Sequence, residues 1–160
     1  FKKVNLYKRD KSNAQDNSSS EAVMLEFLQK KKFDDDDMFL LVQVTSPTTT
    51  SQDINNAIDK LKAQNKDSLL SVVREKKFFW NDDFNPINYD FKSRPRRQDF
   101  NGVLLENGAF YINKVKNILR DKNRLSGEVC FYEMKDYNSI DIDEQIDWEI
   151  AETYMKEYVL

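Results

Sequence analysis

The fold is decided by the run Met38-Phe39-Leu40-Leu41-Val42-Gln43-Val44, a short and almost continuously apolar stretch. Such a run predicts a strand that is covered on both faces, as in a parallel sheet. Thr45-Ser46-Pro47 ends that strand, and the helix that follows has apolar residues at a helical spacing, at Ile54, Ala57, Ile58 and Leu61. A second buried strand is predicted from Ser68 to Val73. This alternation of strands and helices is typical of an α/β fold.

Working outward from this centre, an earlier helix is predicted from about Ser19 to Lys31, because Ser18-Ser19-Ser20-Glu21 has the form of a capping box. Downstream, strands are expected at 103–105, 109–112 and 129–134, with a turn at 106–108, and a helix is expected at 144–158. That last helix would place several apolar residues on one face, namely Ile146, Ile150, Ala151, Tyr154 and Tyr158.

Residues 75–100 differ from the rest, since they are aromatic, charged and interrupted by prolines, with no sustained hydrophobic period. This pattern predicts either an irregular excursion from the core or an arm that serves dimerisation and substrate binding. No repeat or low-complexity linker divides the chain, and its length suits one domain spanning 1–160.

Composition narrows the possible functions. The 160 residues include 25 basic and 28 acidic side chains and no histidine, which excludes a Ser-His-Asp triad, a Cys-His dyad and histidine metal ligands. Glycine occurs only at Gly102, Gly108 and Gly127, so the first hundred residues contain no glycine-rich phosphate loop. The net charge of −3 argues against nucleic acid as a partner.

Cysteine content and hydropathy bear on the cellular setting. Cys130 is the single cysteine and lies in a strand-like run, so we expect a buried thiol in a reducing compartment. The longest apolar run, Met38 to Val42, is far shorter than the ~20 residues that span a membrane. We therefore expect no membrane partner, and nothing in the chain has the pattern of a signal peptide.

The clearest candidate for chemistry is Ser139-Ile140-Asp141-Ile142-Asp143. In an extended segment alternate side chains point the same way, so Asp141 and Asp143 would share one face. Two convergent carboxylates form a hard-oxygen site that suits Mg²⁺ together with substrate phosphates. The spacing also fits a strand end whose aspartates cap the next helix, with Asp143 as its N-cap.

Arginines gather in the segment Arg94-Pro95-Arg96-Arg97-Gln98, where several guanidiniums could bind a carboxylate or a phosphate. The same composition also fits an exposed basic turn or a cluster of the nuclear-import type. The residues alone do not decide between these interpretations.

Two more segments place polar groups at the ends of predicted elements. Gln43 stands near the carboxyl end of the first predicted strand, where ligands of open α/β sheets bind, although a plain polar strand end fits equally well. Arg9 precedes a helix that starts near Ser18-Ser19-Ser20, and free N–H groups there could hold an anion. An ordinary helix cap is the alternative.

Taken together and in this order, the segments resemble the acylneuraminate cytidylyltransferases, also called CMP-sialic acid synthetases. The amino-terminal pattern is met by Arg9, Ala14, Asp16, Ser19 and Ser20, and the Gln-x-Thr-Ser-Pro pattern by Gln43, Thr45, Ser46, Pro47, Asp53 and Ile54. Matches to the animal-type branch are Ser71 to Arg74, Phe78, Trp80, Arg94 to Asp99 and Glu106 to Tyr111. The Asp141 and Asp143 segment, followed by Asp147-Trp148 and Ala151-Glu152, completes the resemblance.

The resemblance implies a Rossmann-like nucleotide-sugar transferase fold, with a mostly parallel sheet, helices on both faces and a protruding dimerisation arm. It implies that the 2-hydroxyl of a sialic acid attacks the α-phosphorus of CTP, giving CMP-sialic acid and pyrophosphate with the help of Mg²⁺. Asp141 and Asp143 would hold the metal. The substrate-binding residues implied are Arg9, Ser20 and Gln43 for the nucleotide, Arg96 or Arg97 with Gln98 for the acceptor, and Asn107 and Tyr111 in the pocket. Which of the two arginines makes the key contact stays open.

The chain departs from the family pattern at one point, because the glycine-rich triphosphate loop that opens the family's fold has no counterpart in it. The interpretation is that the amino-terminal βα units are absent and that these 160 residues alone do not turn over CTP. Two alternatives to the sialic acid assignment remain. The first is another acceptor, such as legionaminic, pseudaminic or ketodeoxyoctonic acid. The second is a non-catalytic sugar- or nucleotide-binding module. A homodimer in the cytoplasm is expected, or in the nucleus for an animal protein.

Overall fold

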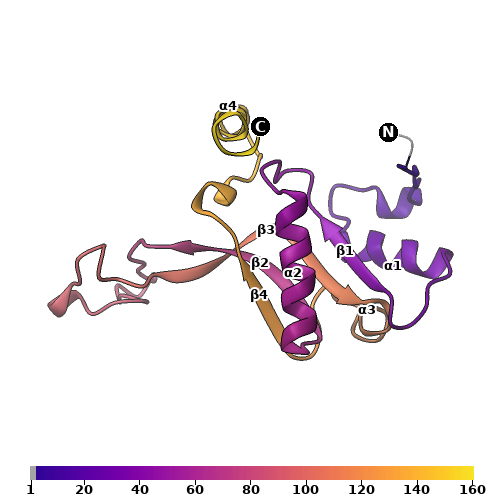
Figure 1. Ribbon diagram of the computed structural model, residues 1–160, viewed down its shortest axis with the longest axis horizontal. Coiled ribbons are helices and arrows are strands. Elements are labelled where there is room, and N and C mark those ends of the chain that lie inside the picture. Colours follow the sequence, from indigo (N-terminus) through magenta and orange to yellow (C-terminus); the bar gives the residue numbers. More distant parts are fainter. Residues whose placement is uncertain (1–2) are drawn as a thin grey trace.

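The computed structural model describes residues 3–160 and confirms an α/β fold around a four-stranded sheet (Figure 1). The strands stand in the order β1-β3-β2-β4. Their bounds are Met38–Val42 for β1, Ser68–Glu75 for β2, Val103–Lys114 for β3 and Val129–Glu133 for β4. β3 is antiparallel to both of its neighbours, whereas β2 and β4 are parallel. Three strands therefore share one direction, as predicted, but the reversed β3 makes the sheet mixed.

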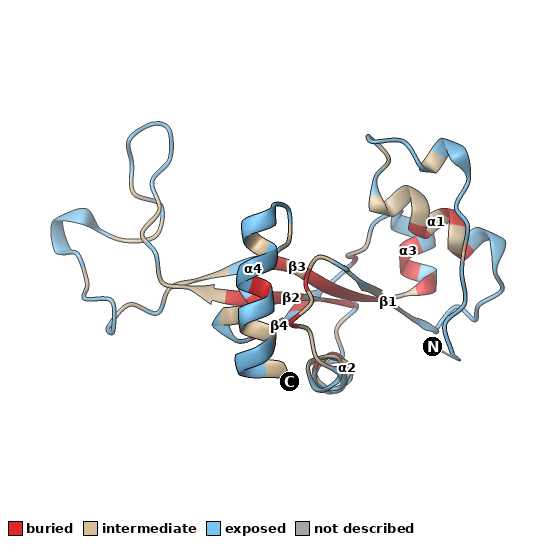
Figure 2. Cartoon of the chain, turned by 90° about the horizontal axis from the view of Figure 1, so that it is seen from above, coloured by how far each residue is buried: buried red, intermediate tan, exposed pale blue. Residues whose placement is uncertain are grey.

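Helices cover both faces of the sheet, which confirms the predicted layering. The α-helices of the described range are α1 Ser20–Lys30, α2 Ser51–Gln64, α3 Val115–Asp121 and α4 Gln145–Tyr154. α2 packs on one face, while α1 and α3 lie on the other (Figure 2). None of these helices is long and apolar enough to cross a membrane.

Each face of the sheet has its own apolar cluster, because neighbouring residues of a strand point to opposite sides. Leu40 of β1 packs with the cluster that contains Ala57 of α2, whereas Phe39 packs with the cluster that contains Met24 of α1. Phe110 and Ile112 of β3 are fully buried. Burying side chains of this size contributes about 1.5–3 kcal/mol each, so β3 is the main anchor of the core.

The prediction that residues 38–44 form a strand buried on both faces is wrong in extent and burial. β1 ends at Val42, which is 45% exposed, and Val44 beyond it is 92% exposed. β1 stands at the edge of the sheet and pairs only with β3 among the described strands. Apolar side chains near its end therefore lack a neighbouring strand to cover them. Cys130 of β4 is buried as predicted, and burial raises the pKa of its thiol.

The predicted turn at 106–108 is also wrong, because β3 runs without reversal through these residues. Leu70 of β2 lies opposite Tyr111, whereas Val72 lies opposite Glu106. The pairing register of β2 and β3 therefore shifts between these two positions, and β3 forms a bulge there. Gly108 has φ +72°, a value that L side chains rarely adopt. Ser71, facing the bulge, accepts a hydrogen bond from the backbone N–H of Phe110 at 3.0 Å. We call residues 106–108 the β3 bulge.

The segment between β2 and β3 is the irregular excursion that the sequence predicts, and it projects from one end of the sheet (Figure 1). We call residues 76–101 the arm. Its base is fixed at Gly102, where a Cβ would lie 2.5 Å from the carbonyl oxygen of Glu75. Inside the arm, Phe78 packs on Tyr89 with ring centroids 4.3 Å apart. The arm thus has a small aromatic core of its own.

The terminal helix is confirmed, but its apolar face is largely uncovered in the described structure. α4 ends at Tyr154 and continues as a π-helical turn, Met155–Val159. Of the five apolar residues predicted on one face, Ala151 is buried, whereas Ile146 is 56% exposed. The π turn is held by Tyr158, whose ring stacks on that of Tyr137 at 4.6 Å.

Candidate functional site

Two predicted segments come together at the carboxyl end of β1. Gln43 is tied to β3 by its backbone N–H, which donates to the carbonyl of Ala109 at 2.9 Å. The backbone N–H of Ile142 donates to the carbonyl of Thr45 at 3.0 Å, nearly one hundred residues away in the chain. This bond docks the segment that carries Asp141 and Asp143 on the loop that follows β1.

A buried network of amides holds the same loops from below. Asn138 is 2% exposed, and its Nδ2 donates to both the carbonyl and the hydroxyl of Thr48 at 3.0 Å. Asn107 of the β3 bulge donates to the carbonyl of Asn138 at 2.8 Å. Asn107 is only 7% exposed and its Oδ1 has no protein partner. The structure therefore places Asn107, a predicted substrate-binding residue, beneath the loops as a support.

The carboxylates of Asp141 and Asp143 are exposed, whereas Ile140 and Ile142 beside them are half-buried. This alternation is the one expected of an extended segment with both carboxylates on its outer side. Neither carboxylate forms an ion pair within the described part of the chain. Two free carboxylates on a fixed segment are hard oxygen donors of the kind that Mg²⁺ takes together with phosphates.

The alternative role of Asp143, as the N-cap of the next helix, is wrong. The N-cap of α4 is Glu144, which forms a capping box with Asp147. Asp147 Oδ2 accepts the backbone N–H groups of Asp143 and Glu144 at 3.1 and 2.9 Å. The side chain of Asp143 is therefore not used to start the helix. Between residues 3 and 160, no cluster of three or more acidic or cysteine side chains has the form of a closed metal site.

Arg9 and Ser20 lie together at a second place, a cavity of about 340 Å³ between the amino-terminal segment and α1. Its polar lining comes from Arg9 and from Ser18, Ser19 and Ser20, and its apolar lining from Tyr7, Val23, Met24, Phe27, Phe39 and Leu41. Ser19 is the N-cap of α1 and accepts from the N–H of Ala22 at 3.1 Å. Arg9 is exposed and has no ion pair among the described residues. A helix start and a free guanidinium therefore share one cavity.

Tyr111 belongs to a chain of polar contacts across the face of the sheet. Its hydroxyl donates to Glu106 of the β3 bulge, and the guanidinium of Arg124 lies 4.8 Å from its ring centroid. Arg124 also pairs with Glu21 in the first turn of α1. Glu21 therefore pairs with an arginine and not with the helix start, so the predicted capping box is wrong.

Burial, and then the bond to Glu106, raises the pKa of Tyr111 to about 12. Tyr111 is consequently neutral at physiological pH and donates its hydroxyl hydrogen to Glu106. The role of Arg124 is one that the sequence did not reveal, because nothing in its local pattern indicates that its partners lie 13 and 103 residues away.

The structure separates the two candidate arginines. Arg96 is exposed and pairs with Asp99 at 2.6 Å. Arg97 lines a polar cavity of about 330 Å³ at the base of the arm, opposite Asp136 and Ser139. Those two residues stand shortly before the Asp141 segment in the chain, while Asp141 and Asp143 are not among the residues that line this cavity. Gln98, which follows Arg97 in the chain, is exposed.

Comparisons with known proteins agree with the motifs. No family model matches the chain. Over 154 residues, or 92% of its length, it is similar to two Danio rerio proteins, N-acylneuraminate cytidylyltransferase A (36% identical) and B (37%). N-acylneuraminate cytidylyltransferase of Oncorhynchus mykiss is 34% identical over the same length. The chain spans only about 35% of the length of these relatives.

A solved structure gives an independent view of the fold. The crystal structure of 4-diphosphocytidyl-2C-methyl-D-erythritol synthase from Anaerococcus prevotii superposes on 88% of this chain and 68% of that chain, with a TM-score of 0.59. The sequences are only 14% identical, so this likeness concerns the fold. It agrees with the α/β architecture predicted from the strand and helix pattern.

Proposed function

We propose that the chain forms part of a cytidylyltransferase that activates sialic acid with CTP. In this reaction the anomeric 2-hydroxyl of the sugar forms a bond to the α-phosphorus, and the bond to the departing pyrophosphate breaks. The observation that carries the proposal is the docking of the Asp141 segment on the loop after β1 through Ile142 and Thr45. It brings together, at one end of the sheet, two segments that resemble motifs of the acylneuraminate cytidylyltransferases.

Asp141 and Asp143 would hold Mg²⁺ in this proposal. Their support is geometric: the carboxylates are exposed on one side of a segment whose isoleucines are packed against the protein. When bound, the ion neutralises charge on the substrate phosphates. Because phosphoryl transfer is catalysed mainly by positioning and electrostatic stabilisation, the absence of histidine from the chain is compatible with this chemistry.

Arg9 and Ser20 would bind the nucleotide at the cavity beside α1, and Gln43 would stand at its border with the sugar. The proposal is supported by the unpaired guanidinium of Arg9 and by the start of α1, whose N–H groups favour negative charge. The apolar lining of the cavity suits a flat ring.

Arg97 would meet the acceptor, with Gln98 nearby and Tyr111 as a wall. Arg97 is preferred over Arg96 because Arg96 is already paired with Asp99, whereas Arg97 faces a polar cavity. A guanidinium there can bind a carboxylate through two parallel hydrogen bonds. A panel of 2-keto sugar acids tested with the complete protein distinguishes sialic acid from its eight- and nine-carbon analogues.

A homodimer formed through the arm is part of the proposal. The arm exposes large apolar side chains far from the sheet, with Phe84 87% and Ile87 64% exposed. Exposed apolar groups of this kind mark surfaces that associate. The cytoplasm is the proposed compartment, because the one cysteine is buried and free and needs no oxidising environment.

Calorimetric titration of the chain with CTP, in the presence and absence of Mg²⁺, tests the proposal. We expect Mg²⁺ to strengthen CTP binding and Asp143→Ala to weaken it about tenfold, the effect of losing about 1.4 kcal/mol. Asp59→Ala, an exposed carboxylate on α2, serves as the matched control and is expected to change nothing.

If Asp143→Ala bound CTP as tightly as the parent chain, the assignment of Asp143 as a metal ligand would be wrong. No CTP binding by the parent chain under any condition would remove the nucleotide assignment as well. Pyrophosphate release provides a separate check, since we predict no turnover by a chain without a glycine-rich phosphate loop, and normal turnover would contradict this.

A further inference from the structure

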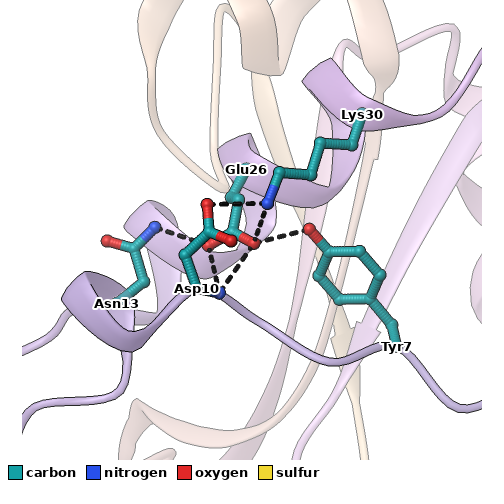
Figure 3. Close-up of polar contacts among 5 residues, drawn as sticks. All are labelled: Tyr7, Asp10, Asn13, Glu26 and Lys30. Atoms are coloured by element: carbon teal, nitrogen blue, oxygen red, sulfur yellow. Dashed lines mark hydrogen bonds and ion pairs between the residues drawn. The ribbon is translucent and has the colours of Figure 1, made fainter.

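The buried carboxylate of Glu26 gathers polar groups from residues 7–13 and from α1 (Figure 3). The side chain of Glu26, on α1, is 6% exposed and accepts hydrogen bonds from Tyr7 Oη at 2.6 Å and Asn13 Nδ2 at 2.7 Å. It also accepts the backbone N–H of Asp10 at 3.0 Å and forms an ion pair with Lys30 at 2.9 Å. Lys30 in turn reaches the carboxylate of Asp10 at 2.6 Å. We call these five residues the Glu26 cluster.

The electrostatics of the cluster keep Glu26 charged. The bond from Tyr7, followed by that from Lys30, lowers the pKa of Glu26 to about 2. A buried charge is tolerated only where it is paired and hydrogen-bonded, and here the donors come from one irregular segment and one helix. Without Glu26, the segment 7–13 would lose the acceptor that holds it against α1.

Arg9 lies in the chain between two of the residues that bind Glu26. Tyr7 and Asp10 are fixed on either side of it, and the ring of Tyr7 packs edge-on against Phe27 at 5.0 Å. Tyr7, Arg9 and Phe27 all line the cavity at the start of α1. The backbone at Arg9 is therefore set by contacts that do not involve the Arg9 side chain itself.

We propose that Glu26 is a positioning residue for nucleotide binding, which it serves by holding the 7–13 segment so that Arg9 faces the start of α1. The inference rests on the proposed function, because it takes the cavity to be the nucleotide site. Glu26 itself does not touch the nucleotide. Its carboxylate is already occupied by Tyr7, Asp10, Asn13 and Lys30.

A double-mutant cycle in the 160-residue chain tests this role, with CTP and excess Mg²⁺ titrated by calorimetry. Glu26→Gln keeps the shape of the side chain and removes its charge, and we expect CTP affinity to fall about tenfold. Arg9→Ala should weaken binding by at least as much. Glu26→Gln added to Arg9→Ala should cause little further loss, because Glu26 acts through Arg9.

Hydrogen exchange gives the local readout. The amide of Asp10 should exchange faster in Glu26→Gln, while amides of β3 keep their protection. Glu149→Gln, an exposed carboxylate on α4, is the matched control for loss of one charge. If Glu26→Gln unfolds the chain, Tyr7→Phe and Asn13→Ala can be used in its place. Each removes one hydrogen-bond donor to Glu26, and each should weaken CTP binding by less than the tenfold expected for Glu26→Gln.

The outcomes separate the inference from the proposed function. A parent chain that binds no CTP overturns both. CTP binding that is weakened by Arg9→Ala but unchanged in Glu26→Gln, despite faster exchange at Asp10, overturns the role of Glu26 alone. Losses that simply add in the double variant show that Glu26 acts independently of Arg9, which also overturns it.

Discussion

Arg9 and Asp141 are both carried by segments with little regular structure. One segment is held in place by charged side chains and the other by neutral ones. The segment around Arg9 is fixed by a charged centre, Glu26, with Lys30 as its counterion. The segment before Asp141 is fixed by neutral amides, with Asn138 bridging Thr48 and the β3 bulge.

This difference shows that the two halves of the candidate site depend on solution conditions in different ways. A carboxylate cluster combines strong, charge-assisted hydrogen bonds with sensitivity to acid. An amide network does not titrate between acid and neutral pH, but every member that is removed leaves a buried partner unsatisfied. Variants in each cluster can therefore break one half of the site while leaving the other intact.

The largest effect on stability is expected for Asn138→Ala. This change leaves the carbonyl and hydroxyl of Thr48 without the donor that now serves them, in a place where Asn138 is 2% exposed. An unsatisfied buried group costs about 1–3 kcal/mol. We expect the free energy of unfolding, measured by urea denaturation, to fall by that amount at neutral pH.

Asn55→Ala is the matched control, because Asn55 is an exposed residue of α2. Its stability should stay within about 0.5 kcal/mol of the parent. If Asn138→Ala were as stable as this control, the amide network would not be what holds the Asp141 segment.

An intermediate effect, present at neutral pH and lost in acid, is expected for Glu26→Gln. The pKa of Glu26 is lowered from its ordinary value of 4.5 to about 2, so its contribution to stability is complete above the unfolded value. That contribution is lost as the pH falls toward 2. Stability of the parent should therefore decline more steeply with acid than that of Glu26→Gln, as measured by urea midpoints between about pH 7 and pH 3.

Asn138→Ala provides the contrast in the same experiment. Because amides do not titrate in this range, its stability curve should lie below that of the parent and run parallel to it. Parallel curves for the parent and Glu26→Gln would contradict the assignment of Glu26 as a charged centre.

The sequence predicts those parts of the fold that follow from local pattern. The helical spacing of Ile54, Ala57, Ile58 and Leu61 leads directly to α2, which buries Ala57 and Leu61. The β3 bulge could not be predicted in this way, because Asn107-Gly108 is also typical of a turn. What keeps β3 straight is pairing with strands on both sides, and that pairing depends on residues far away in the chain.

The residues of the candidate site show the same difference between what local pattern predicts and what depends on distant contacts. Motif residues such as Arg9, Ser20, Asp141 and Asp143 are predicted as site residues from their order and spacing, and their assignment stays a prediction. Their supports could not be predicted, since the partners of Glu26 lie 13 to 19 residues away apart from Lys30, and Asn138 bonds to Thr48 across 90 residues. A single polar residue gives no sign in sequence of which distant donor it will meet.

The arm extends the comparison to a third region. Its loop of residues 81–85, which we call the tip of the arm, is held by neither an ion pair nor buried amides among the described residues. Phe84 is 87% exposed and has φ +64°, a conformation that is unusual for a bulky side chain. Phe84→Gly removes the apolar group and tolerates that φ, so we expect the free energy of unfolding to change by about 0.5 kcal/mol or less. This is the smallest stability effect of the series.

The same change should act on association. If the arm joins two copies of the chain, sedimentation equilibrium should show a weaker dimer for Phe84→Gly, because exposed apolar groups at the tip supply the contact. Phe84→Leu keeps an apolar group in the same backbone conformation and should dimerise nearly as well as the parent. Equal dimerisation by Phe84→Gly and the parent would show that the tip of the arm does not supply the contact, and a monomeric parent would remove the dimer itself. A stable but monomeric Phe84→Gly would instead show that the arm serves assembly. The stability of the chain would then come from the sheet and the apolar clusters on its two faces.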